Sequence, residues 1–298
     1  MSRLLGGVPK KKQISWFLIL SSLSLILLIV TFYIPILYAI WFAFTDYDAL
    51  SRPRFVGLFN FQKAFTDKVF WISFRNTLVY TLMVVPLTTV ISFLIALALN
   101  ENSAFSRIMR LFYLLPLVTS SVAIAFAWRW IYNPSYGILN TILGLFGVQP
   151  IRWLVSPNTA LVSIAILGIW SSTSYYILIY LAGLQNIPEE LYEAARIDGA
   201  SGWQQLIHIT VPLISPTTFF VIVTCFISAL QVFDPVFLLT NGGPGYSTYT
   251  VTFYIYQNGF VWFRMGYGMA ISWILLGLVM IITAVQFIAQ KRWVHYYA

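Results

Sequence analysis

The chain has 298 residues, of which 59% are hydrophobic and 9% charged, and its mean hydropathy is +0.81. Soluble domains average roughly 25% charged residues, so this composition excludes a soluble protein and indicates an all-α membrane protein that crosses the bilayer several times. A net charge of +8 would suggest nucleic acid in a soluble chain. In a membrane protein, basic residues belong on loops beside lipid headgroups, so we expect membrane lipid and no nucleic acid as a partner.

Six segments are long and apolar enough to cross a bilayer, which takes about 20 residues. We expect transmembrane helices at residues 16–44, 76–99, 108–130, 160–184, 212–239 and 268–289. The first follows Lys10-Lys11-Lys12 and is too long for the apolar region of a signal peptide, so we interpret it as a helix that stays attached. Between the spans, longer loops are expected on the outer side at residues 45–74, 131–158 and 240–267.

Orientation depends on position rather than on a count of charges. The basic residues divide almost equally between the two sides, but the lysine triplet directly precedes the first span, which usually dominates. We therefore place both termini in the cytoplasm. The expected organisation is a tail at 1–15, a transmembrane domain at 16–290 with a cytoplasmic loop at 185–211, and a second tail at 291–298.

The cytoplasmic loop before the fifth span predicts two short helices. Glu189 and Glu190 favour the positive end of the first helix, and Pro188 suits its first turn. Gly199 supplies the turn, because glycine adopts positive φ without strain. Residues 201–204, Ser-Gly-Trp-Gln, read as a capping box that begins the second helix, and Pro212 is expected to end it.

The same loop carries a recognisable pattern. It reads Glu193-Ala194-Ala195-Arg196-Ile197-Asp198-Gly199, followed after nine residues by Ile209-Thr210-Val211-Pro212. This resembles the EAA signature of bacterial ABC importer membrane subunits, EAA-x3-G-x9-I-x-L-P, with Val211 where leucine is usual. The flanks at 184–188 and 239–244 also look like permeases of the carbohydrate-uptake branch (the maltose/glycerol-phosphate type), and the resemblance extends from about 75 to 290.

The resemblance implies a six-span permease subunit of a binding-protein-dependent ABC sugar importer in the bacterial plasma (inner) membrane. The EAA loop would lie between helices four and five and dock on an ATPase. The implied partners are a second homologous permease, two cytoplasmic ABC ATPase subunits and an extracytoplasmic solute-binding protein. The implied coupling residues are Glu193, Ala194, Ala195, Asp198 and Gly199.

The chain shows no chemistry of its own. It has no G-x-x-x-x-G-K-[ST], G-x-S-x-G or H-E-x-x-H motif, so we expect no catalytic residue and assign ATP and Mg to the partner ATPases. Cys225 is the only cysteine, and His208 and His295 are the only histidines. A disulfide within the chain and a metal site are therefore not expected.

Polar side chains within spans are the candidates for substrate contact. By the resemblance, the expected set is Ser121, Trp170, Ser171, Ser172, Tyr175 and Gln231. Hydroxyls and an amide would bind sugar hydroxyls, and an aromatic face would stack on a pyranose ring. Serine and threonine also join helices to one another, so a structural role stays open for each hydroxyl.

The charges favour a neutral solute. The middle of spans three to five has no lysine or arginine to bind a phosphorylated substrate, so we expect a neutral sugar, oligosaccharide or glycoside-type solute. An ion-coupled secondary transporter is a weaker alternative, because Asp234 is the only acid in a span, and its role stays open. An integral-membrane enzyme on lipid-linked substrates is another, but Asp46, Asp48 and Asp67 form no recognisable catalytic set.

Overall fold

The computed structural model describes residues 21–101 and 103–295. The predicted N-terminal tail, the start of the first span and the last three residues lie outside the described residues. The described chain divides into two compact units. Unit 1 holds the residues up to Ala64 together with Asn258–Trp273, and unit 2 holds Phe65–Gln257 together with the residues from Ile274.

Unit 1 is built around the first apolar helix, Ser21–Ala43, which contains a π-helical segment at Ile29–Tyr33 and ends as α2 (Ile34–Ala43). A two-stranded antiparallel sheet follows, in which β1 (Thr45–Asp46) pairs with β2 (Arg54–Phe55). Most of α3 (Phe59–Thr66) and the first turns of α14 (Met265–Ala289) complete the unit. In the loop between the strands, Asp48 accepts hydrogen bonds from the backbone of Ser51 and Leu50 and from the Ser51 hydroxyl, which lowers the pKa of its carboxyl.

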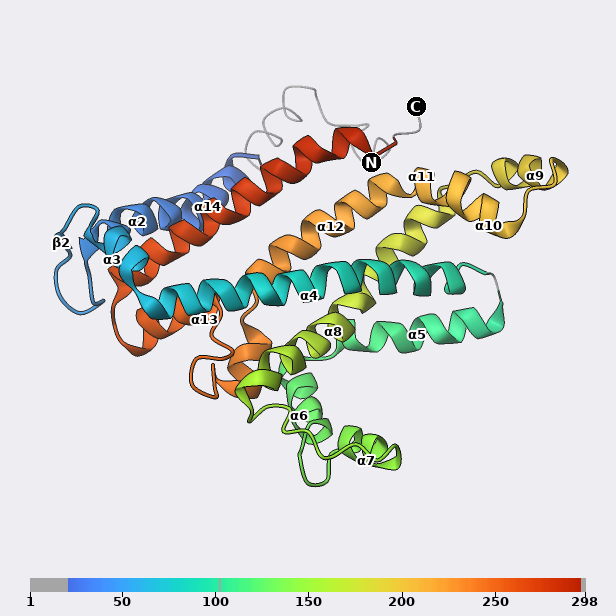
Figure 1. Ribbon diagram of the computed structural model, residues 1–298. Helices are drawn as coiled ribbons and strands as arrows, with labels where there is room; N and C mark the ends of the chain where they lie inside the picture. The colour runs from blue at the N-terminus through green and yellow to red at the C-terminus, as the bar shows by residue number, and fades with distance from the viewer. Residues whose placement is uncertain (1–20, 102, 296–298) are drawn as a thin grey trace, which may run out of the picture. The chain divides into compact units, whose positions relative to one another are not determined.

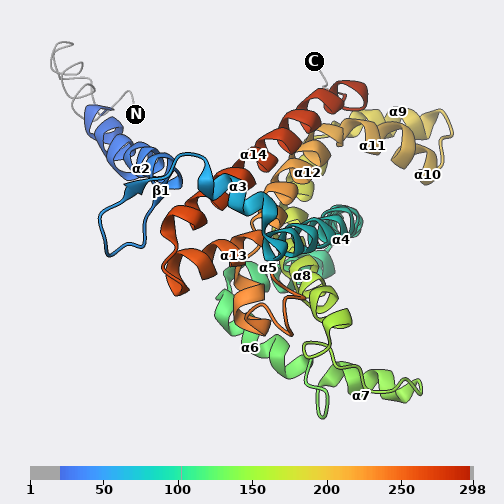
Figure 2. The same ribbon diagram turned by 60° about the vertical axis from the view of Figure 1, so that its left-hand side comes forward.

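Unit 2 contains the remaining helices. They are α4 (Lys68–Leu99), α5 (Ala104–Val118), α6 (Ser121–Ile131), α7 (Ile138–Leu145), α8 (Pro157–Gln185), α9 (Glu189–Ile197), α10 (Gly202–Gln205), α11 (Val211–Leu213), α12 (Ser215–Leu230), α13 (Val251–Tyr256) and the later turns of α14. In its core, α4 packs along α8 and α12 (Figure 1). In both views α9 and α10 lie at one end of the unit, far from α6 and α7 (Figures 1 and 2).

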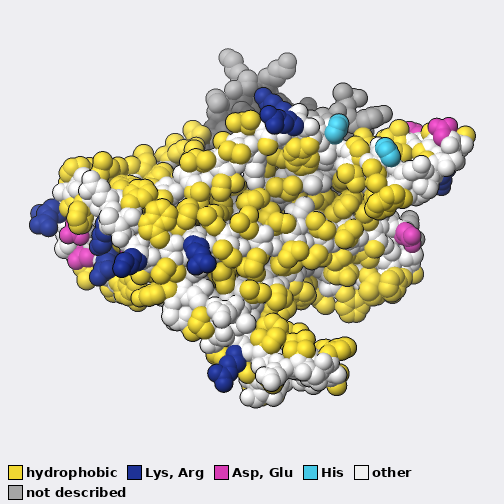
Figure 3. All heavy atoms as spheres, in the orientation of Figure 1, with side chains coloured by type: hydrophobic (Ala, Val, Ile, Leu, Met, Phe, Trp, Pro, Cys, Tyr) yellow, Lys and Arg dark blue, Asp and Glu magenta, His cyan; other side chains and the backbone are white. Residues whose placement is uncertain are grey.

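Several polar side chains in the long helices form hydrogen bonds with the backbone of their own helix. In α4, the hydroxyls of Thr77, Thr81 and Ser92 each donate to a carbonyl one turn earlier in the same helix. Arg110 donates from Nη2 to the Leu99 carbonyl oxygen at 2.6 Å and so caps the end of α4. Figure 3 shows hydrophobic side chains over most of one face of the protein, as a lipid-facing surface requires.

Among the residues that the structure describes, four helices are long and apolar enough to cross a membrane: Ser21–Ala43, Lys68–Leu99, Pro157–Gln185 and Met265–Arg292. Two further pairs qualify only if each bent pair forms one span, so the count lies between four and six. The third and fifth predicted spans are each interrupted by a bend. The third bends by 103° between α5 and α6, and the fifth by 61° between Leu213 and Ser215.

Proline explains the bend in the fifth span. Pro216 has no N–H, so the Pro212 carbonyl oxygen loses its usual donor, and the Ser215 hydroxyl donates to it instead at 2.6 Å. The prediction that Pro212 ends the loop helix is wrong: helical structure continues to Leu213. A second break follows α12, because Val232 and Phe233 are not helical; helical structure resumes at Asp234 and continues into π-helical Val236–Thr240.

The loops predicted on the outer side contain short helices that the sequence did not reveal. α3 lies in the first, α7 in the second and α13 in the third. α4 also begins earlier than predicted, at Lys68, because the Asp67 side chain caps it by accepting from the Val69 N–H at 2.8 Å.

Candidate functional site

The loop between α8 and α12 folds as two short helices joined at Gly199. The Ala200 N–H donates to the Ala195 carbonyl at 2.9 Å, and the Gly199 N–H donates to the Arg196 carbonyl at 3.1 Å. Gly199 itself has a φ of +77°. These are the paired bonds of a Schellman motif, which places a left-handed residue directly after the helix. The predicted glycine turn is confirmed.

The second helix of the loop begins with the predicted capping box. The Ser201 side chain accepts from the Gln204 N–H, and the Gln204 side chain accepts from the Ser201 N–H. Helical structure then continues through π-helical Leu206–Thr210 into α11. A hydrogen bond of 2.9 Å between the Tyr192 and Thr210 hydroxyls ties α9 to this segment. The loop is therefore a preformed structure connected to the start of α12.

The loop presents a mixed polar and apolar surface. Glu193, Ala194, Asp198 and Gly199 are exposed, and Ala195 is half-buried. Ile197 is 87% exposed and Trp203 69% exposed. Sequence analysis did not single out these two side chains as docking residues, although a large apolar residue on a polar loop is a signal for a partner.

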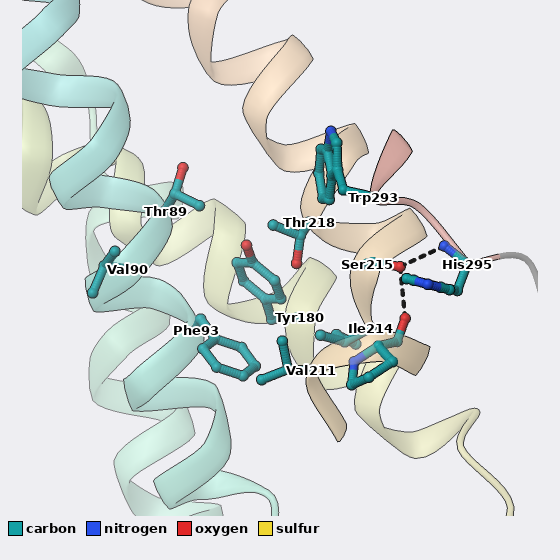
Figure 4. A pocket seen from close by; sticks show the side chains of 11 residues that line it. Thr89, Val90, Phe93, Tyr180, Val211, Ile214, Ser215, Thr218, Trp293 and His295 are labelled. Carbon is teal, nitrogen blue, oxygen red and sulfur yellow. Dashed lines mark hydrogen bonds between the residues drawn. The ribbon is translucent and has the colours of Figure 1, made fainter. Parts of the chain in front are cut away.

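The base of the loop borders a pocket of about 400 Å³ at the start of α12, defined here as the loop-base pocket (Figure 4). Its lining includes Tyr180 from α8, Phe93 from α4, and Ser215. The backbone N–H of His295 donates to Ser215 Oγ at 2.8 Å, and Figure 4 shows this bond beside the one from Ser215 to Pro212. Ser215 thus links the loop, the span that follows it and the end of the chain.

A second cavity, of about 350 Å³, lies among α4, α8 and the end of α12. We call it the polar cavity. Its polar lining residues are Tyr80, Ser171, Ser172, Ser228, Gln231 and Asp234. None of its lining residues is lysine, arginine or histidine. The cavity therefore offers hydroxyls, an amide and a carboxylate to a solute rich in hydroxyl groups.

Close helix packing and a broken helix shape the polar cavity. α4 and α8 approach closely at Gly168, where an added Cβ would lie 2.2 Å from Tyr80 Oη. Gln231 lies where α12 ends, and the Thr250 hydroxyl supports the non-helical segment by donating to the Val232 carbonyl at 3.0 Å. Non-helical backbone within a membrane is tolerated where it lines a cavity or is buried in protein.

The structure gathers some of the predicted substrate residues and separates others. Ser171, Ser172 and Gln231 line the polar cavity together. Trp170 lines a separate apolar hollow of about 650 Å³, where its ring lies 5.6 Å from that of Trp128. Ser121, at the start of α6, and Tyr175 line neither space.

Sequence analysis missed Tyr80 as a cavity residue. A single sequence does not distinguish a tyrosine that lines a cavity from one at the membrane interface or in the core. Ser228 and Asp234 were visible as polar residues of the fifth span, and the helix break brings them to the cavity. Within residues 21–101 and 103–295, no group of three or more His, Cys, Asp or Glu side chains could hold a metal ion.

Comparison with known proteins identifies the fold. Residues 88–295 match the family described as binding-protein-dependent transport system inner membrane component. The chain belongs to this family. It is thus a permease subunit of an ABC transporter in the inner membrane and not an enzyme, as the EAA pattern predicted.

Individual relatives cover nearly the whole chain. The sequence is 38% identical over 268 residues to the probable ABC transporter permease protein YesP of Bacillus subtilis strain 168, covering 88% of this chain and 86% of the relative. It is 34% identical over 280 residues to the trehalose/maltose transport system permease protein MalF of Thermococcus litoralis, covering 93% of each.

A solved structure is similar as well. It is a bacterial alginate ABC transporter in complex with an alginate pentasaccharide-bound periplasmic protein, with a TM-score of 0.83 and 25% identity. The match covers 95% of this chain and 96% of that chain. The fold of an ABC permease is therefore confirmed.

Proposed function

We propose that this permease moves a neutral sugar, oligosaccharide or glycoside-type solute into the cytoplasm through the polar cavity. The observation that carries the proposal is the chemistry of that cavity, in which Ser171, Ser172 and Gln231 surround about 350 Å³ at a helix break. Its lining has hydrogen-bonding groups and no cation. The relatives named for trehalose/maltose and for alginate support a carbohydrate substrate.

The substrate residues divide into two groups. Ser171, Ser172 and Gln231 would bind sugar hydroxyls in the conformation described here. Trp170, Ser121 and Tyr175 lie outside the polar cavity, and we propose that they meet the solute in another conformation of the transport cycle. A transporter that alternates between two states exposes different side chains in each, so one conformation need not collect the whole set.

The partners follow from the position of the loop. We propose that α9 and α10 face the cytoplasm and dock on one of two ABC ATPase subunits, which bind ATP and Mg. A second, homologous permease would complete the pathway, and a solute-binding protein would deliver the sugar from outside. The similar alginate transporter is in complex with a periplasmic protein, which supports the last of these partners. Both termini would then lie in the cytoplasm.

Coupling is tested by variants of the loop in the assembled complex. We expect Glu193→Ala and Gly199→Pro to abolish most of the substrate-stimulated ATP hydrolysis, because the first removes an exposed carboxylate and the second destroys the turn at φ +77°. Gly202→Ala is the matched control, since a Cβ at Gly202 meets no atom within 4 Å. Stimulation at the wild-type level in both loop variants would refute the docking role.

Solute charge is tested by competition in reconstituted vesicles containing the whole complex and its binding protein. We expect neutral sugars to inhibit uptake of the transported solute. Sugar phosphates should need an at least roughly tenfold higher concentration for the same inhibition, because the cavity has no cation to pair with a phosphate. Gln231→Ala should weaken uptake of the neutral solute. Preferential uptake of phosphorylated sugars would reverse the assignment.

A further inference from the structure

Unit 1 contains a hollow of about 460 Å³ that the proposed transport function does not use. Its lining includes three basic side chains and one acidic side chain, namely Arg54, Lys63, Arg264 and Asp46. Two phenols, Tyr47 and Tyr267, lie among them. We call it the basic hollow. Its lining favours a ligand with negative charge and several hydrogen-bond acceptors.

The walls of the basic hollow are fixed by a set of backbone contacts. Asn60 Nδ2 donates to the Ala43 carbonyl at 3.0 Å and to the Thr45 carbonyl at 2.9 Å, which joins α3 to the end of α2. The Gly266 N–H donates to the Tyr47 carbonyl at 3.0 Å. A Cβ at Gly266 would lie 2.0 Å from the Thr45 carbonyl oxygen, so α14 begins in direct contact with this turn.

Arg54 keeps most of its charge available. Arg54 Nη2 lies 3.8 Å from Asp46 Oδ2, but these side chains are 82% and 74% exposed, and such open ion pairs are weak. Lys63 Nζ lies over the Tyr267 ring at 4.7 Å from its centroid, which positions the ammonium group. The lining as a whole carries three cationic side chains and one carboxylate.

The basic hollow lies beside the ends of two candidate spanning helices. The first candidate span ends at Ala43, just before Asp46 and Tyr47, and the last begins at Met265, between Arg264 and Tyr267. Positions directly beyond the ends of spans lie at the depth of lipid headgroups. Figure 3 shows basic and acidic side chains gathered in the region where Figure 1 places β2 and α3.

We infer that the basic hollow binds the phosphate of an anionic phospholipid such as phosphatidylglycerol. Free phosphate offers the same charge, but only a lipid keeps its phosphate at this depth. Apart from Arg264 and Tyr267, the residues of the lining lie before residue 88, where the family match begins. A lipid there would hold the ends of α2 and α14 at the surface.

The test is native mass spectrometry of the purified transporter from micelles with equal phosphatidylglycerol and phosphatidylcholine. We expect the wild type to retain phosphatidylglycerol preferentially, and Arg54→Gln/Lys63→Gln/Arg264→Gln to reduce that preference roughly tenfold or more, since each cation near anionic lipid strengthens its binding. Asp46→Asn should have the opposite effect and increase retention. This second variant removes the acid, so loss of folding cannot produce its expected result.

The matched control removes the same charge elsewhere. Arg52→Gln/Lys68→Gln/Arg75→Gln changes three exposed cations outside the lining of the hollow and should leave the lipid preference within about twofold of wild type. An equal loss in the control, or equal retention of both lipids by the wild type, would overturn the inference. Displacement of the lipid by millimolar inorganic phosphate would also overturn it, because the site would then recognise phosphate alone.

Discussion

Gly168 shows how a single residue sets the geometry of the polar cavity. Tyr80 is 3% exposed, and its hydroxyl occupies the space that a side chain at position 168 would need. The contact holds α4 against α8 one turn before Ser171 and Ser172. A change at either position should therefore alter the shape of the cavity as well as the stability of the unit.

We predict that Gly168→Ala destabilises the protein by about 1–3 kcal/mol, because overpacking forces the tyrosine or the helices to move. Tyr80→Phe should restore part of the loss by removing the nearest atom. Thermal unfolding followed with a thiol-reactive dye measures both, since Cys225 is buried in the folded chain. Gly277→Ala, with no atom within 4 Å of the added Cβ, is the control that should unfold at or above the wild-type temperature.

The elements that connect the loop to the spans are bent rather than straight. α11 and α12 meet at Ile214, where Pro216 removes a backbone donor and Ser215 replaces it. α8 also comes close here, because a Cβ at Gly183 would lie 2.5 Å from Thr217 Oγ1. In the coupling proposed above, a force on α9 would reach this junction through α11 and then α12.

Ser215→Ala should destabilise the protein by about 1–3 kcal/mol, because it leaves the His295 N–H and the Pro212 carbonyl without their partner. The same substitution should lower the stimulation of ATP hydrolysis by solute. Ser272→Ala is the matched control, since the Ser272 hydroxyl bonds only a carbonyl of its own helix. Equal melting temperatures for the two variants would show that Ser215 does not stabilise the junction.

At the scale of the whole molecule, sequence analysis predicted the class, the loop and most spans, and each success has a local cause. The long apolar runs and the spacing from Glu193 to Pro212 are visible in one sequence. The turn at Gly199 and the capping box at Ser201 depend on neighbouring residues only.

The failures include features that the sequence pattern did not reveal and one residue whose role depends on a distant contact. The bend before Ser121 and the helices inside the outer loops were not recognised. Tyr80 could not be assigned to the cavity, because its position depends on α8, which lies far away in the sequence. The roles proposed for the substrate residues stay predictions, since the present conformation places Ser171, Ser172 and Gln231 together but not Ser121, Trp170 or Tyr175.

The central claim is that α9 and α10 dock on an ATPase in the cytoplasm, and site-directed cross-linking tests it most directly. Ile197→Cys, in a chain whose Cys225 is changed to Ser, places one reactive thiol at a position that is 87% exposed. We predict that a short bifunctional reagent joins this thiol to an ATPase subunit of the purified complex, and that a membrane-impermeant maleimide added outside intact cells does not modify it. Modification from outside, without a cross-link to any ATPase, would contradict the account.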